Sequence, residues 1–214
     1  LDGVFEYDLS GASVSSAGDV NGDGFDDLII GAWGADSSGL FSGSSYVIFG
    51  KNSGFDAILD ISNLDGSNGF RLNGVAEGDQ SGYSLSTAGD VNGDGFDDII
   101  IGANYADANG ENSGASYVIF GKASGFDATV ELSSLDGNNG FRLEGAVAGD
   151  YSGRSVSTAG DFNGDGFADL IIGAFGAEPN GQDSGSSYLV YGKASGFSAS
   201  LNLADLGSSD GILL

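Results

Sequence analysis

Three nine-residue stretches of this sequence follow the pattern D-x-N-x-D-G-x-x-D, which places oxygen-bearing side chains at positions one, three, five and nine. Position seven needs to offer only its backbone carbonyl, so a phenylalanine there is compatible with metal coordination. Calcium takes about six to eight hard oxygen ligands, and the glycine after position five permits the sharp turn that gathers them. We therefore predict about three calcium ions, one per stretch. The predicted ligands are Asp19, Asn21, Asp23, Phe25 and Asp27; Asp90, Asn92, Asp94, Phe96 and Asp98; and Asp161, Asn163, Asp165, Phe167 and Asp169.

Other interpretations of these loops are weaker. An EF-hand loop needs an acidic residue at position twelve, followed by a helix, but Ile30, Ile101 and Ile172 occupy that position within apolar runs. Magnesium prefers fewer protein ligands and more waters. A plain Asn-Gly hairpin turn would not require four oxygen-bearing residues at fixed offsets in three copies.

Two further positions in the loops have predicted roles. The acid at position eight, Asp26 or Asp97, becomes Ala168 in the third copy, so we expect this position to lie outside the ligand shell or to face solvent. The ring at position seven is expected to pack inward. Three bound calcium ions would bring the formal charge from −25 to −19, and relief of carboxylate repulsion would couple binding to folding.

The composition limits the possible classes of protein. The 214 residues include 40 Gly, 31 acidic and 6 basic residues, with neither Cys nor His. The net charge disfavours nucleic acid and anionic membranes as partners. Disulfides, zinc-thiolate sites and Ser-His-Asp triads are excluded. No apolar run approaches the ~20 residues of a membrane helix, and the first residues lack a signal-peptide pattern. The 14 Phe and 8 Tyr argue against disorder.

The acidic loops belong to an internal repeat. The segment that starts at Ala17 recurs almost unchanged from Ala88 and from Ala159, an interval of 71 residues each time. We therefore divide the chain into repeat units 1–71, 72–142 and 143–214, which together form one continuous repeat domain. A strict period of this length indicates that each unit builds the same supersecondary structure.

Each unit contains about four short strands. In the middle unit they are 83–87, the β-branched run 98–103, the alternating segment 115–121 and the short segment 141–143. The connection 126–132 is left open as a strand or an irregular arm. Four strands in tandem repeat predict an all-β fold of β-propeller blades. A β-sandwich would explain the strands but not the period.

The middle unit resembles the FG-GAP repeats of integrin α-chain β-propellers and their bacterial relatives. It carries Ser81-Gly82-Tyr83-Ser84, the loop Asp90–Asp98 and then Ile99–Ala103. The Phe-Gly start is replaced by Ser-Gly, and the Pro after Gly-Ala is Asn104 here. The resemblance covers the whole chain and is greatest to repeats of large secreted bacterial calcium-binding proteins. It therefore implies an extracellular or cell-surface location.

The resemblance also implies where ligands bind. In the family, the calcium loop joins the first two strands of a blade, and ligands meet the opposite face. A protein or glycan ligand would then contact the variable loops Gly34–Ser42, Tyr105–Ser113 and Gly176–Ser184 and the inter-blade loop Gly74–Gly82. The alternative is that these loops are only solvated. Because a propeller needs roughly 4–8 blades, the chain is expected to be a fragment of a ring, half of a homodimer or a subunit of a polymer.

The leading functional hypothesis is a calcium-binding, non-enzymatic propeller for extracellular adhesion or structural assembly, with no catalytic residues. The alternative is a propeller domain of a secreted hydrolase acting on carbohydrate or another extracellular substrate, with a carboxylate pair as acid and base. Asp8, Asp79 and Asp150 recur at one phase, so we interpret them as turn-capping acids rather than a singular active site. Trp33 is expected to pack at a rim. The repeated basic residues are expected to pair with carboxylates.

Overall fold

The computed structural model describes residues 3–55, 57–123 and 125–214, and they form three separate β-sheets. The first sheet contains, in spatial order, β1 (Ser13–Gly18), β2 (Asp27–Ala32), β3 (Ser44–Ile48), β4 (Gly69–Asn73) and β8 (Thr129–Glu131). The second contains β5 (Ser84–Gly89), β6 (Asp98–Ala103), β7 (Ala115–Ile119), β9 (Gly140–Glu144) and β13 (Ser200–Asn202). The third contains β10 (Ser152–Gly160), β11 (Asp169–Ala174), β12 (Ser186–Val190) and β14 (Gly211–Leu213).

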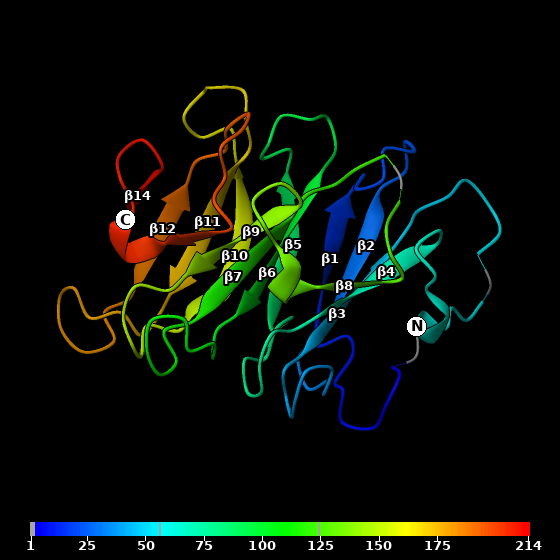
Figure 1. Cartoon of the computed structure of the whole chain (residues 1–214), viewed down its shortest axis with the longest axis horizontal. Coiled ribbons are helices and arrows are strands. Elements are labelled where there is room, and N and C mark those ends of the chain that lie inside the picture. Colours follow the sequence, from blue (N-terminus) through cyan, green and yellow to red (C-terminus); the bar gives the residue numbers. More distant parts are fainter. Residues whose placement is uncertain (1–2, 56, 124) are drawn as a thin grey trace.

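The three sheets stand side by side in a row that runs in chain order from the first to the third (Figure 1). Four consecutive strands of each sheet pair antiparallel in sequence order, as in a propeller blade. The predicted fold class is therefore confirmed: the chain is all-β and built of blades, and three blades do not close a ring. The sandwich alternative is wrong, because the strands form three sheets rather than two.

The strands form where the sequence offers continuous or alternating apolar residues. All six residues of β6 are buried, as expected for a strand covered on both faces. At the end of β5 the register shifts between Thr87 and Gly89, and the same irregularity ends β1 and β10. Such a bulge bends the strand, and each acidic loop begins directly after it.

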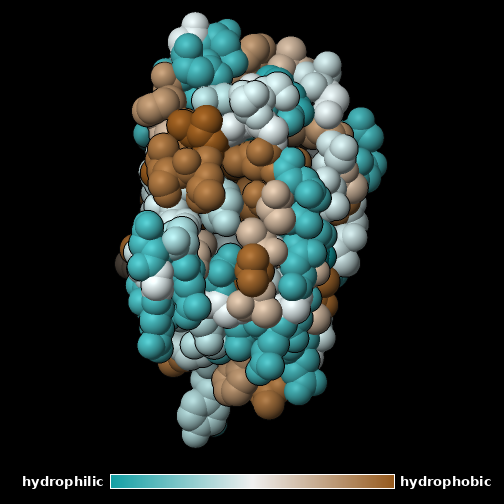
Figure 2. Space-filling view, turned by 90° about the vertical axis from the view of Figure 1, so that its left-hand side faces the viewer, coloured by the Kyte–Doolittle hydropathy of each residue, from teal (hydrophilic) through white to brown (hydrophobic). Residues whose placement is uncertain are grey.

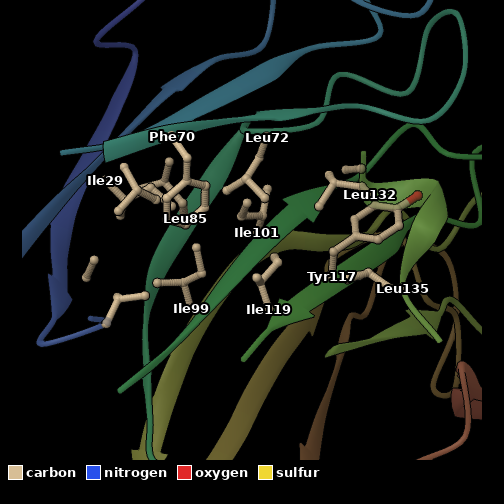
Figure 3. Packing of buried hydrophobic residues seen from close by; sticks show 14 of the residues in the cluster. Ile29, Phe70, Leu72, Leu85, Ile99, Ile101, Tyr117, Ile119, Leu132 and Leu135 are labelled. Carbon is tan, nitrogen blue, oxygen red and sulfur yellow. The ribbon is translucent and has the colours of Figure 1, made fainter. Parts of the chain in front are cut away.

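In the described part of the chain, two hydrophobic clusters lie between neighbouring sheets, and a third lies on the first sheet alone, with Ile30, Tyr46 and Ile48 among its members. Ile29, Phe70 and Leu72 of the first sheet pack against Leu85 and Ile99 of the second (Figure 3). A second cluster joins the second sheet to the third in the same way. Full burial of a large apolar side chain is worth about 1.5–3 kcal/mol, so contacts between neighbouring sheets supply much of the stability.

The connection left open between strand and arm is an arm that reaches back to the preceding sheet. From the second unit, β8 adds in parallel to β4, with Arg71 opposite Thr129. The ring of Phe126 stacks on Phe70 with centroids 4.6 Å apart. A 3₁₀ turn, η2 (Leu132–Ser134), follows and buries Leu132. Similar turns, η1 (Ile61–Asn63) and η3 (Leu203–Asp205), occupy the same phase in the other units.

The third unit repeats this exchange. β13 adds in parallel to β9 with Arg142 opposite Ser200, and Phe197 stacks on Phe141 at 4.7 Å. The predicted units 1–71, 72–142 and 143–214 stay a prediction, since these limits fall within the outer strands. In the described part of the chain, no helix has the length and apolar character needed to cross a membrane.

Candidate metal centre

The three predicted calcium loops occupy one structural position in all three sheets. They connect β1 to β2, β5 to β6 and β10 to β11, so they share one end of the strands. The last predicted ligand of each loop, Asp27, Asp98 or Asp169, is the first residue of the second strand. The repeat therefore delivers the same four side chains to equivalent places at one end of each sheet.

The second loop shows how the chain curls around its acidic side chains. The N–H of Asp94 donates to Asp90 Oδ1 at 3.0 Å and to Asn92 Oδ1 at 2.9 Å. The N–H of Gly95 donates to Asp90 Oδ2 at 2.9 Å, and that of Phe96 donates to Asp94 Oδ1 at 3.0 Å. The first and third loops repeat these bonds. The side chains that would bind a cation thus also fix the loop.

The acid at position nine connects the loop to the sheet. Asp98 is buried, and its two carboxylate oxygens accept N–H groups of Val91 and Gly121, each at 2.9 Å. Gly121 lies just beyond β7, so this one side chain joins the loop to the far end of the third strand. Asp27 and Asp169 are buried and bonded in the same manner.

Burial gives two of these carboxyls unusual acidities. It raises the pKa of Asp98 to about 8 and that of Asp27 to about 6. The two backbone N–H donors oppose this shift, whereas the nearby carboxylates of Asp94 and Asp90 add to it at Asp98. A buried acid beside like charges favours its neutral form, and a bound cation would reverse that preference.

The donor chemistry of each loop fits a hard cation. Three carboxylates, one amide oxygen and a backbone carbonyl are the ligand types that calcium prefers, and a carboxylate oxygen that accepts an N–H retains a second lone pair. Among residues 3–55, 57–123 and 125–214, no three acidic side chains are gathered closely enough to form a complete metal cluster. The ligand assignments of all three loops therefore stay predictions.

Asp97 has a role that the sequence interpretation missed. Its Oδ2 accepts the N–H of Asp19 at 2.9 Å, and its own N–H donates to the Asp19 carbonyl at 3.2 Å. The Lys122 N–H adds a bond to the Val20 carbonyl. The expectation that this position faces solvent holds for Asp26, which is exposed, but not for Asp97, which is half-buried because it bonds the loop of the preceding sheet. Ala168 keeps only the backbone bond at this position.

The phenylalanines at position seven also contact the neighbouring loop rather than packing inward. The ring of Phe96 lies against Gly22 and that of Phe167 against Gly93, which leaves no room for a side chain at either glycine. Phe25, which has no sheet before it, is exposed. The sequence signal for this contact was the Gly that precedes the Phe by three residues in every loop. The Phe, however, contacts the Gly of the preceding unit's loop rather than that of its own.

The loops that the resemblance assigns to ligand binding lie at the opposite ends of the strands. They connect β2 to β3, β6 to β7, β11 to β12 and β4 to β5. Isolated bridges from Gly43 to Ser81 and from Gly114 to Ser152 join them across sheets. Trp33 lies in this region, with its ring centroid 6.1 Å from that of Tyr83, so the predicted rim packing is confirmed.

The recurring acids Asp8, Asp79 and Asp150 are turn acids, as predicted. Each carboxylate accepts, at 3.1 Å, the N–H of the residue three positions earlier. Burial raises the pKa of all three. Burial also raises the pKa of Asp27 and Asp98, so the raised carboxyl pKa values found among the described residues fall at two repeat phases.

The basic residues follow the predicted pairing in part. Arg142 Nη2 lies 3.1 Å from Glu144, and Lys193 Nζ lies 3.2 Å from Asp210. Lys51 instead lies over the Phe ring four residues later, with Nζ 4.9 Å from its centroid. The lysine of each unit therefore contacts a Phe ring of that unit's own arm.

Comparison with known proteins agrees with this architecture. The FG-GAP repeat pattern matches residues 10–48, 81–119 and 152–190. The chain is 33% identical to integrin alpha-PS5 of Drosophila melanogaster over 76% of its length and 31% identical to integrin alpha-5 of Xenopus laevis over 80%. It is 32% identical to the phosphatidylinositol-glycan-specific phospholipase D of Dictyostelium discoideum over 93%. The matches span 14%, 16% and 22% of those proteins.

Proposed function

This chain belongs to the FG-GAP repeat family, and we propose that it is a calcium-binding, non-enzymatic β-propeller module for extracellular adhesion or structural assembly. The family resemblance stated from the sequence is thereby confirmed. Calcium binding, adhesion and the extracellular or cell-surface, secreted bacterial location belong to the proposal.

One observation supports the proposal most directly. Each acidic loop directs two carboxylates and an amide toward its own turn and places a third carboxylate in the buried start of the next strand. A buried carboxylate without a neighbouring positive charge is costly to ionise, even when N–H groups bond it, and two neighbouring negative charges increase that cost. Calcium would supply the positive charge that keeps such a group ionised.

The chain's own residues would transmit the effect of binding through the fold. Asp98 holds the loop against the end of the third strand through the Gly121 N–H, and Asp97 holds the loop of the preceding sheet through the Asp19 N–H. Fixing the second loop would therefore also fix the junction between the first two sheets. Calcium then stabilises the module as well as each turn.

The proposed partners are calcium, further blades of the same kind, and a protein or glycan ligand. Further blades would come from self-association or from a longer chain. The ligand would meet the loops opposite the calcium loops, 34–42, 105–113, 176–184 and 74–82, because these differ most among the units. The net charge of −25 disfavours nucleic acid.

A second candidate is a propeller segment of a larger secreted hydrolase. The similarity to a phospholipase D over 93% of this chain favours it. The raised carboxyl pKa values at repeated phases, rather than at one singular position, favour a segment without catalytic residues.

The test is a calorimetric titration of calcium into chelator-stripped protein, with circular dichroism before and after. We expect a stoichiometry of about three, with a gain in thermal stability. Asp94→Ala removes one exposed ligand and should lower the stoichiometry by about one, whereas Asp136→Ala, in a turn outside the loops, should leave it unchanged. Absence of heat and of stabilisation at millimolar calcium would refute calcium binding.

A further inference from the structure

The two ends of the row of sheets carry the two unmatched halves of the contact that joins the sheets to one another. Phe96 and Phe167 each lie against a glycine in the loop of the preceding sheet. At the ends, Phe25 of the first sheet is exposed, and Gly164 of the third has no atom near the position that a side chain would take. The first sheet thus carries a Phe ring without a glycine to contact, and the third sheet carries a glycine without a Phe ring against it.

Exposed apolar residues follow the same rule. Leu28 of the first sheet is 51% exposed, while Ile99 and Leu170 at its repeat phase are fully buried against the sheet before them. On the third sheet Phe162 is 63% exposed, while Val91 at its phase is fully buried against the sheet after it. Figure 2 looks onto the side where the third sheet ends the row and shows apolar surface among polar groups.

Backbone and hydroxyl groups repeat the pattern. Ser13 Oγ donates to the Gly82 carbonyl of the next sheet at 2.6 Å, and Ser84 Oγ donates to the Gly153 carbonyl at 2.8 Å. Ser155 has the same phase on the third sheet. The missing carbonyl at that phase is that of Gly11, on the first sheet. The hydroxyl donor of this hydrogen bond therefore lies on the third sheet and its carbonyl acceptor on the first.

The arms provide the most specific match. Inside the chain, Arg71 lies opposite Thr129 and Arg142 lies opposite Ser200 where an arm joins the preceding outer strand. At the ends of the row, the position of the Arg is occupied by Leu213 on β14. The position of the Thr or Ser is occupied by Ile58, in the arm of the first unit that corresponds to 126–132 of the second. They are 59% and 68% exposed.

This change of residue type distinguishes a second copy from an unrelated partner. An exposed outer strand is usually protected by charged residues, yet the Arg found on the outer strands of the first and second sheets is replaced on the third by Leu213. Its counterpart on the first arm changes from Thr or Ser to Ile58. Both members of the pair have become apolar together, as expected if they face each other.

We propose that copies of this chain associate head to tail, so that the third sheet of one copy packs on the first sheet of the next and Ile58 lies opposite Leu213. The first arm then adds in parallel to β14, as β8 adds to β4 and β13 to β9. Two copies supply six sheets, within the roughly 4–8 of a closed propeller; a contact that does not close produces longer assemblies. This inference rests on the blade architecture of the proposed function but not on calcium binding.

The absence of cysteine from the sequence permits a direct test by disulfide trapping. The double variant Ile58→Cys/Leu213→Cys should form, on mild oxidation, species of two or more chains whose linked peptides join positions 58 and 213. The matched variant Arg142→Cys/Ser200→Cys has the same register within one chain and should give a linked monomer. Both new positions on the ends are exposed, so folding is not at risk.

A mass measurement on the unaltered chain completes the test. Light scattering after size exclusion should give at least twice 21.4 kDa at high concentration, and Leu213→Asp should return it to 21.4 kDa. Since each copy carries −25, added salt should strengthen association. Monomers at every concentration, or trapped dimers linked only 58 to 58 or 213 to 213, would overturn the inference. A monomer that still binds calcium would leave the proposed function intact.

Discussion

Removing the ring of Phe126 should destabilise the protein far more than removing its repeat counterpart Phe55. Phe126 is 9% exposed and lies between two rings of the preceding sheet, with centroids 4.6 Å from Phe70 and 5.4 Å from Phe49. Phe55 is 53% exposed. The two residues hold one position in the arm, so they differ only in whether a preceding sheet receives the ring.

The magnitude follows from this burial. Truncation of a buried Phe to Ala costs about 3–5 kcal/mol, and an arm near the surface places Phe126→Ala at the lower end, about 3 kcal/mol. For a chain of this length that corresponds to a loss of about 6–12 °C in Tm. Phe55→Ala loses mainly the Lys51 contact at 4.9 Å, worth about 0.5–1 kcal/mol at an exposed site.

The assay is denaturant unfolding of dilute protein, followed by circular dichroism for all sheets and by fluorescence of Trp33, the single tryptophan. Trp33 lies between the first and second sheets, so Phe126→Ala should shift its transition strongly. Phe197→Ala, which loses the equivalent stack on the second sheet, should affect the circular dichroism transition more than the fluorescence. Equal losses for Phe55→Ala and Phe126→Ala would refute the reasoning that the arm stabilises the preceding sheet.

Two further predictions concern carboxylates. Asp97→Ala should lower the free energy of unfolding by about 1 kcal/mol, because it removes the charged acceptor of the Asp19 N–H. The control Asp26→Ala, on the exposed end of the row, should change the free energy of unfolding little. Thermal denaturation compares the two variants, and equal effects would contradict a stabilising bond from Asp97. Burial raises the pKa of Asp79 above 3.8, so its contribution to stability falls as pH rises from that value, and Asp79→Asn should become more stable relative to the parent toward neutral pH. Asp136→Asn should show the opposite trend, because N–H donors lower the pKa of Asp136, and identical pH profiles would count against both assignments.

Local features of the fold were predictable from the sequence. The run 98–103 matches β6 residue for residue, because its centre, Ile99–Ile101, is the continuous β-branched run expected of a strand buried on both faces. The loop positions between the first two strands followed from the spacing of Asp90 and Asp98. These features depend on residues close together in the chain, and the repeat displayed each of them three times.

Contacts between units were not predictable from one unit. Asp97 bonds Asp19, 78 positions earlier in the chain, and Phe96 contacts Gly22 of the same preceding loop, while their local sequence resembles that of any turn. The arm strand β8 has three residues, too short for periodicity to identify. The loop carboxylates fall between these cases: their spacing predicts ligands, while the structure engages their oxygens with backbone N–H groups.

Because each arm pairs with the sheet before it, that sheet cannot be completed during synthesis until the arm of the next unit has been made. The first sheet is completed by β8, and the Asn73–Glu131 hydrogen bond at its edge joins residues 58 positions apart. At about 5–20 residues per second, the ribosome would need about 3–12 s after β4 has been made to deliver that last strand. The edges of the first and second sheets therefore stay open until the first three strands of the following sheet have been made, and these two edges are sealed in chain order.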